Sequence, residues 1–282
     1  MFLGLWIAWA GLNMVRKQAN MMTKMLKHKI IDAHPDKSGC LLLGSKSFTN
    51  RMEQELKHDP IWFSKFRMKI KTEEKYLGQV IKSSLSISAL ATAQDRAGKI
   101  KGAAIEIKQI IEDYQMQAIG GLAAAWVLWE RAFIPSLLAG ADTWLGDIQE
   151  AVKFCNTIQE FYWKTVLKVL DSCPKLALRC ETFSRRIKWR IWEEKCLLVI
   201  RIQNLEEGSL AKQIYEEAEN RGWPGLGKEV TDICREIQIP NINTHKVSKT
   251  VIQKAVENSH WEDMMSQFDQ SSKLQDIKYC DF

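Results

Sequence analysis

Basic side chains alternate along one short segment of the sequence, and this pattern suits the binding of an anion. If residues 65–71 (KFRMKIK) form an extended strand, one of its faces carries Lys65, Arg67, Lys69 and Lys71. Successive side chains of a strand point to opposite faces, so we expect one exposed basic face and one buried apolar face. A row of cations of this kind suits the phosphate backbone of a nucleic acid.

Basic residues are concentrated in the first third of the chain. Residues 1–101 contain 18 lysines and arginines against 8 aspartates and glutamates, whereas residues 102–282 contain 22 against 26. This asymmetry predicts an anionic partner for the first third, most often nucleic acid, and next an acidic protein or a membrane surface. A solvated surface that is simply basic is the alternative.

Familiar catalytic and metal-binding sequences are absent from the chain. It contains no GxSxG, P-loop, GxGxxG or HExxH sequence, and its seven cysteines form no CxxC pair. His34, between Asp32 and Asp36, lies in a proline-containing stretch that is typical of a turn rather than of a metal site. We therefore expect no metal ligands and no cofactor for this chain, and reduced, mostly buried thiols.

The first residues, MFLGLWIAWAG, form an apolar run in which Ala8-Trp9-Ala10 mimics a signal-peptidase site. No basic residue precedes the run, and it is too short to span a bilayer. We expect it to begin a buried strand or helix. The prediction is a cytoplasmic or nuclear protein without a membrane partner, and secretion or membrane tethering is the alternative.

Hydrophobic periodicity predicts an α+β fold, in which a small α/β piece (residues 1–82) precedes a helical region (83–240) and a polar tail (241–282). Residues 65–71 should form a hairpin with residues 75–81 across a Thr-Glu-Glu turn. Residues 116–140 are nearly free of charge, which predicts a buried helix that is broken or kinked around Pro135. Further helices are expected at residues 12–29, 48–59, 88–112, 147–170, 187–203 and 209–221, and a buried strand at 40–44.

The order of these elements resembles the C-terminal palm and thumb of a reverse transcriptase, specifically of the non-LTR (LINE-type) retrotransposons. AHPDKSGCLLLGSK (33–46) looks like the helix-turn-strand that carries a lysine in that family, and KYLGQVI (75–81) looks like its primer-grip hairpin. CNTIQEFYWKTVLKVLDSCPKLALRCET (155–182) and IKWRIWEEKCLLVIRI (187–202) look like its helices beyond the thumb. The resemblance covers most of the chain, and its specificity comes from the order and spacing of these stretches.

The resemblance implies roles for individual residues. Lys37 would act as a general acid on the departing pyrophosphate or neutralise it, and an ordinary turn lysine is the alternative. The corner at Tyr76, Leu77 and Gly78 would press on the primer terminus, where a glycine permits close approach of the backbone. Nucleic acid would also contact the basic strand and a helix surface that carries Arg96, Lys99 and Lys101.

The sequence departs from the family at the residues that matter most for polymerisation. A complete family member holds Mg²⁺ through aspartates, whereas this chain has no aspartate or glutamate before Asp32. The family also tends to have glycine after Glu-Thr, where this chain has Phe183. We therefore expect a truncated retrotransposon-derived fragment that is inactive alone, with weak residual binding of an RNA or DNA primer-template. The alternative is a helical protein-interaction module without a nucleic-acid role.

Overall fold

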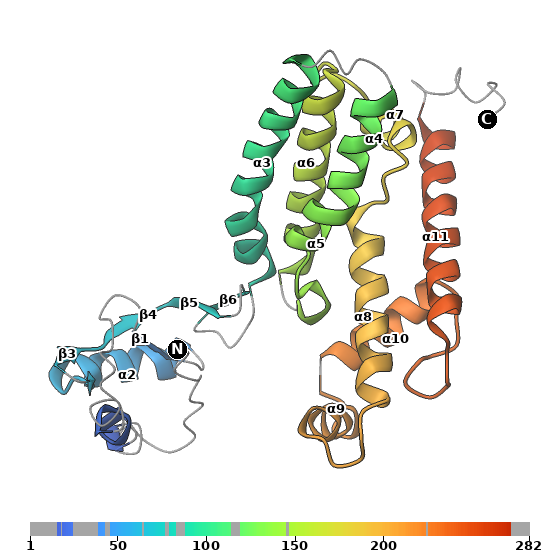
Figure 1. Cartoon of the computed structure of the whole chain (residues 1–282). Coiled ribbons are helices and arrows are strands. Elements are labelled where there is room, and N and C mark those ends of the chain that lie inside the picture. The colour runs from blue at the N-terminus through green and yellow to red at the C-terminus, as the bar shows by residue number, and fades with distance from the viewer. Residues whose placement is uncertain are drawn as a thin grey trace. The chain divides into compact units, whose positions relative to one another are not determined.

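The computed structural model describes residues 16–17, 19–24, 39–42, 46–63, 65–76, 79–82, 88–113, 119–144, 147–223 and 225–271. The chain divides into two compact units, a first unit (Met1–Ser88) and a helical unit (Ala89–Phe282). Figure 1 shows short strands in the first unit and long helices in the second. The described residues thus form a mostly helical α+β structure, as the sequence predicts.

The described residues of the first unit form six short strands and two helical stretches. Residues 16–17 and 19–24 are helical and lie within the amphipathic helix predicted at residues 12–29. The other elements are β1 (Gly39–Leu41), α2 (Lys46–His58), β2 (Trp62–Phe63), β3 (Phe66–Arg67), β4 (Lys69–Lys71), β5 (Glu73–Tyr76) and β6 (Gln79–Lys82).

Strand pairing in the first unit differs from the hairpin that the sequence predicts. Strand β4 pairs in parallel with β1, so that Gly39 lies opposite Lys69, and β2 pairs with β3. The hairpin forms instead between β5 and β6, in which Tyr76 lies opposite Gln79. Two residues connect that pair, which is the length of the commonest hairpin connections. The predicted Thr-Glu-Glu turn is therefore wrong, because both glutamates belong to β5.

Apolar residues from both helical stretches and from the strands form the core of the first unit. Ala19, Leu56, Ile61 and Phe63 are buried, and the apolar residues of β3 and β4 pack against them. The Phe63 and Phe66 rings meet edge to face, with 5.9 Å between their centroids. This packing fixes which face of the β3–β4 segment is turned inward.

The helical unit consists of nine α-helices and two shorter helical turns among its described residues. The helices are α3 (Ala89–Asp113), α4 (Ile119–Leu128), α5 (Ile134–Leu137), α6 (Ile148–Leu167), α7 (Lys175–Glu181), α8 (Ile187–Gln203), α9 (Leu210–Asn220), α10 (Leu226–Glu236) and α11 (Lys249–Gln270). A π-helical turn, η2 (Trp129–Phe133), joins α4 to α5, and a 3₁₀ turn, η3 (Ala141–Thr143), follows α5. Helix α3 packs against α6, and α8 packs against both α10 and α11 (Figure 1).

The apolar segment around α4 is only partly buried, so the prediction of a buried helix is wrong. Gly121, Ala125 and Trp129 are buried at intervals of four residues, whereas Trp126 and Val127 are 41% and 50% exposed. The irregularity lies in η2, which ends two residues before Pro135, and the chain continues helically through that proline. No helix among the described residues is long and apolar enough to cross a membrane.

An aromatic cluster forms the centre of the α3–α6 half of the helical unit. The centroid of the Trp129 ring lies 4.8 Å from the centroid of the Tyr162 ring and 6.1 Å from that of the Trp163 ring. The Tyr162 hydroxyl donates a hydrogen bond of 2.7 Å to the Ala125 carbonyl, one turn before η2. Burial raises the pKa of Tyr162, so the hydroxyl stays protonated and keeps this bond.

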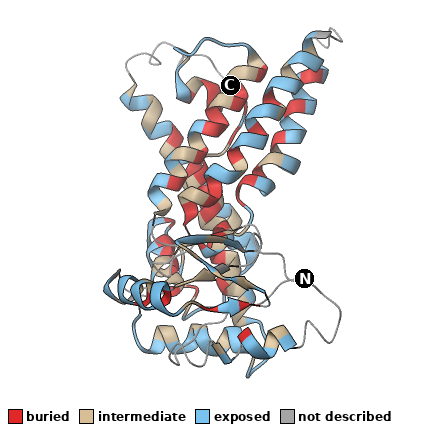
Figure 2. Cartoon of the chain, turned by 90° about the vertical axis from the view of Figure 1, so that its left-hand side faces the viewer, coloured by how far each residue is buried: buried red, intermediate tan, exposed pale blue. Residues whose placement is uncertain are grey.

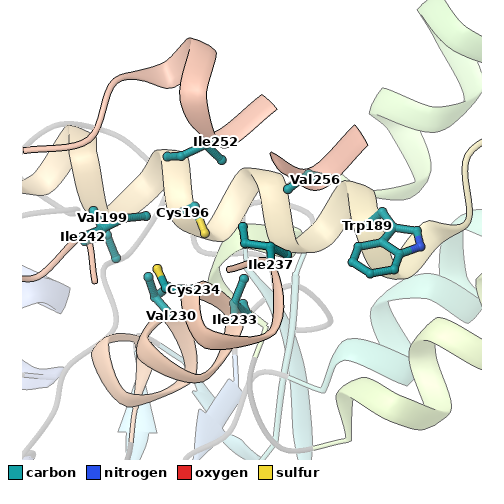
Figure 3. Close-up of a cluster of buried hydrophobic side chains, with 10 residues drawn as sticks. All are labelled: Trp189, Cys196, Val199, Val230, Ile233, Cys234, Ile237, Ile242, Ile252 and Val256. Carbon is teal, nitrogen blue, oxygen red and sulfur yellow. The ribbon is translucent and has the colours of Figure 1, made fainter. Parts of the chain in front are cut away.

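A second core lies where α8 meets α10 and α11 (Figure 3). Figure 3 shows Cys196 and Cys234 facing each other among aliphatic side chains from these helices. Hydrogen bonding with Cys234 and burial both raise the pKa of Cys196. Of the six described cysteines, Cys155, Cys196 and Cys234 are buried, and all six are free thiols.

Lys195 is the most deeply buried cation among the described residues, with a side chain that is 0% exposed. Its ammonium group donates to the Trp144 carbonyl and forms an ion pair with Glu229. Burial lowers the pKa of Lys195, and the contacts with Glu229 oppose that effect. A buried ammonium group that is satisfied in this way links α8 to α10 and to the residue after η3.

Candidate functional site

The predicted basic face of residues 65–71 is present in the first unit. Lys65, Arg67 and Lys69 are exposed, whereas the intervening Phe66 and Met68 pack against the core. The period-two prediction is therefore confirmed for the exposure of these side chains. Lys65 lies in a turn before β3, Arg67 belongs to β3 and Lys69 to β4, so the single strand expected over residues 65–71 is divided into two short strands with different partners.

The basic residues of this strand face are not equivalent. The Arg67 guanidinium donates to the Leu56 carbonyl at 3.2 Å, so part of its hydrogen-bonding capacity is used within the unit. Lys71 is half-buried and forms an ion pair with Glu74. Lys65 and Lys69 are both exposed, whereas Lys71 is not.

The other residues expected in the first unit are only partly described. Tyr76 ends β5, opposite the first residue of β6. Lys37, Leu77 and Gly78 lie outside the described residues, as do His34 and the apolar N-terminal run. The structure thus places the end of the predicted primer-grip strand and leaves the role of Lys37 a prediction.

Arg96, Lys99 and Lys101 belong to α3 in the helical unit and therefore not to the unit of the basic strand face. Arg96 donates to the carbonyls of Leu137 (3.2 Å) and Ala139 (2.6 Å). Burial lowers the pKa of Arg96. Arg96 thus satisfies carbonyl groups at the C-terminal end of α5, a role that helical spacing alone does not reveal.

Lys99 and Lys101 are both exposed on α3. The Lys101 ammonium group lies 5.6 Å from the centroid of the Phe161 ring, which is a cation–π distance. Positions two residues apart in sequence lie about 200° apart around a helix, so these two lysines point to different sides of α3. The structure does not bring the three α3 cations into one row.

Sequence reasoning missed a cluster of charges around α7 in the helical unit. Glu160 of α6 accepts from Arg179 of α7 at 3.2 Å and from Lys175 at 2.8 Å. Both Glu160 and Arg179 are buried. Burial and then repulsion from Arg186 lower the pKa of Arg179, while Glu160 opposes them. Two cations thus share one carboxylate.

The cluster continues toward α11. Arg186 pairs with Asp263 at 2.7 Å. Burial, followed by repulsion from Arg185, lowers the pKa of the nearby His260 to about 4. Burial alone would raise the pKa of Asp263, but its hydrogen bond and ion pair with Arg186 lower it overall. A neutral histidine therefore lies among arginines at neutral pH.

A cavity of about 600 Å³ opens beside this cluster, lined by residues of α6, α7 and α11 and of the segments that flank them. The charged residues of its lining are Lys153, Glu160, Lys175, Arg179 and Arg186. One signal in the sequence could have pointed here, namely Glu160 within QEFYW, where a carboxylate stands beside residues that a helix buries. Among the described residues, no group of three His, Cys, Asp or Glu side chains could hold a metal ion.

Comparisons with protein-family models, with curated proteins and with solved structures find no match to this chain.

Proposed function

We propose that this chain derives from the palm and thumb of a reverse transcriptase and binds the backbone of a nucleic acid through the β3–β4 face. The observation that carries the proposal is the exposure of Lys65, Arg67 and Lys69 on one side of a segment whose other side is packed. Contacts of cations with phosphates give affinity without reading sequence. The proposal therefore assigns binding that depends little on base sequence, and no polymerisation.

The succession of elements supports the derivation. A basic strand face is followed by the β5–β6 hairpin, which contains Tyr76, and then by the helical unit. The resemblance to LINE-type reverse transcriptases implies the same succession, in which the hairpin approaches a primer terminus. Tyr76 at the end of β5 is the described residue best placed to test that expectation.

The test uses fluorescence anisotropy of the full chain with a labelled RNA–DNA primer-template duplex over a range of salt concentrations. The association constant falls as salt rises, and each phosphate contact adds about 0.9 to the steepness of log K against log salt. The double variant Lys65→Gln with Lys69→Gln should therefore make the slope less steep by roughly two. The matched control is Lys249→Gln with Lys254→Gln, two exposed lysines of α11. It should leave the slope unchanged.

Two results would contradict the proposal. Binding that does not depend on salt would show that phosphate contacts do not supply the affinity. Equal slopes for the strand variant and its control would show that the β3–β4 face is not the contact surface. An incorporation assay with Mg²⁺ should show no extension of the primer, and extension would contradict the assignment of binding alone.

A helical protein-interaction module remains the second candidate, and the exposed apolar side of α4 favours it. Leu122, Trp126 and Val127 are each at least 39% exposed, and Figure 2 shows that helices of the chain carry exposed residues beside buried ones. Exposed apolar patches are common features of interaction surfaces. Sedimentation of the wild type against Leu122→Gln with Trp126→Gln tests the simplest partner, a second copy. This candidate requires self-association that the variant loses.

A further inference from the structure

We propose that the cavity between α6, α7 and α11 binds the phosphate monoester of a small polyhydroxylated molecule, such as a sugar phosphate. The cavity is an open depression of about 600 Å³, which can hold a small ligand that stays partly exposed to solvent. All residues that line it belong to the helical unit. The proposal thus concerns a site separate from the β3–β4 face and does not depend on nucleic-acid binding.

The net charge of the side chains around the cavity is positive and can balance a dianion. Its lining contains four cations and one carboxylate, Glu160, and the carboxylate of Asp263 pairs with Arg186 from behind the lining. Two positive charges therefore remain when both carboxylates are counted. A phosphate monoester carries a charge of about −1.5 to −2 at pH 7, which matches this surplus.

The two arginines have hydrogen-bonding capacity that the described protein groups do not use. A guanidinium has five N–H donors. Among the described residues, Arg179 donates one bond to Glu160 and Arg186 one to Asp263. The Nε atoms of both arginines are buried without an acceptor in the described part of the chain. Because the Nε atoms are buried, an acceptor in the cavity would meet the remaining Nη donors, and the Arg186 side chain is 31% exposed.

The remaining lining residues favour a polyhydroxylated body over a nucleobase. Asn156, Thr157, Gln267 and Gln270 each make a hydrogen bond within the chain, and their remaining amide and hydroxyl capacity can serve sugar hydroxyls. The described lining has no aromatic side chain on which a base could stack. Lys153 and Lys175 are exposed at the rim, where they can meet a phosphate at the mouth of the cavity.

The test is isothermal titration calorimetry of the full chain with ribose 5-phosphate, with ribose and with inorganic phosphate as separate arms. Ribose 5-phosphate should bind, and ribose should bind at least tenfold more weakly because it lacks the charged group. Inorganic phosphate should also bind more weakly than the ester because it leaves the amide side chains unused.

Variants at the rim locate the binding without removing the buried arginine. Lys153→Gln with Lys175→Gln should raise the dissociation constant for ribose 5-phosphate by roughly tenfold or more. Glu160 keeps Arg179 as its partner in this variant, so the fold should persist, which circular dichroism verifies. The control Lys249→Gln with Lys254→Gln changes two exposed lysines of α11 and should leave the constant unchanged.

Each of three outcomes would overturn the proposal. Equal binding of ribose and its phosphate would exclude a phosphate site. Equal binding of inorganic phosphate and the ester would exclude the sugar. An unchanged constant in the rim variant would place the binding elsewhere. The strand variant Lys65→Gln with Lys69→Gln should still bind ribose 5-phosphate normally, so failure of one proposal does not entail failure of the other.

Discussion

The helical unit buries some of its basic side chains, whereas none of the basic side chains described in the first unit is buried. In the first unit, Lys65 and Lys69 are exposed on a segment whose intervening apolar side chains pack against the core. In the helical unit, Lys195 is fully buried, and Arg179 lies with Glu160 beneath the surface. Among the described residues, cations that form buried links are therefore found in the helical unit, which also carries exposed lysines.

The difference shows that the positions of charged side chains in the structure indicate a binding surface better than the net charge of a segment does. Residues 102–282 contain more acidic than basic residues, yet the cavity of the helical unit is lined by four cations and one carboxylate. Conversely, Arg96 contributes to the basic count of residues 1–101 while its guanidinium closes α5. Net charge identifies a basic segment, but packing decides which cations can reach a partner.

The largest expected effect contrasts a buried lysine with an exposed one. Lys195→Ala leaves Glu229 without its partner and opens space in the core, so the free energy of unfolding should fall by about 3 kcal/mol. Lys65→Ala should change it by no more than about 0.5 kcal/mol. Urea denaturation followed by circular dichroism measures both. Similar losses in the two variants would remove the distinction between internal and solvent-facing cations.

The next largest effect concerns pH and the neutral His260. Its pKa is about 4 in the folded chain and about 6.5 when unfolded, so the unfolded state takes up the proton first as the pH falls. The stability that depends on a neutral His260 is fully present above the unfolded-state pKa of about 6.5 and is lost progressively below it. The free energy of unfolding should be lower by roughly 2 kcal/mol at pH 5 than at pH 7. Urea denaturation at the two pH values measures the change.

Groups that surround His260 determine the control. Arg179, Arg185 and Arg186 keep their charge over this range, and the lowered pKa of Asp263 confines its own titration to more acidic solution. His260→Gln should therefore flatten the dependence between pH 5 and 7. If the variant retains the full dependence, other groups cause it.

A smaller effect is expected for the pair formed by Arg190 of α8 and Glu130 of η2, which lie 2.5 Å apart. Their side chains are 18% and 17% exposed. Burial lowers the pKa of Arg190, and Glu130 opposes that shift. A double-mutant cycle with Arg190→Gln and Glu130→Gln should give a coupling energy of about 1–2 kcal/mol. Additive single effects would mean that this internal pair behaves like an exposed one.

The smallest predicted change is a gain in stability at Phe183. This residue has φ of +48° and is 76% exposed, so it occupies the left-handed region and buries little apolar surface. Phe183→Gly should raise the free energy of unfolding by about 0.5–1 kcal/mol because glycine adopts this conformation without steric cost. Phe183→Ala keeps a Cβ atom and should gain nothing. Thermal denaturation of both variants separates backbone strain from loss of the ring.

The sequence predicts helices well because their apolar periodicity is local. The predicted helix at residues 187–203 coincides with α8, and the period of residues 65–71 gives the exposure of Lys65 and Lys69. The choice of a strand partner is not local, so the sequence misassigned the hairpin that β5 and β6 form. Apolar content also failed to show which side of α4 is exposed.

The cavity lay beyond sequence reasoning for a related reason. Glu160, Arg179 and Gln267 come from three different helices, and no spacing rule joins α6 and α7 to α11. Their proximity follows from packing α8 against α11 and α6 against α7. By contrast, Phe183 stands where the resemblance implies a glycine, and its backbone has the left-handed conformation that glycine adopts most easily.

The parallel pairing of β1 with β4 has a consequence for the order of folding. Gly39 can meet Lys69 only after α2, β2 and β3 have been brought between them, so this ladder requires closure of a long loop. Each helix of the other unit can form its backbone hydrogen bonds within its own sequence. Within the first unit, we therefore expect α2 to form before the β1–β4 ladder closes.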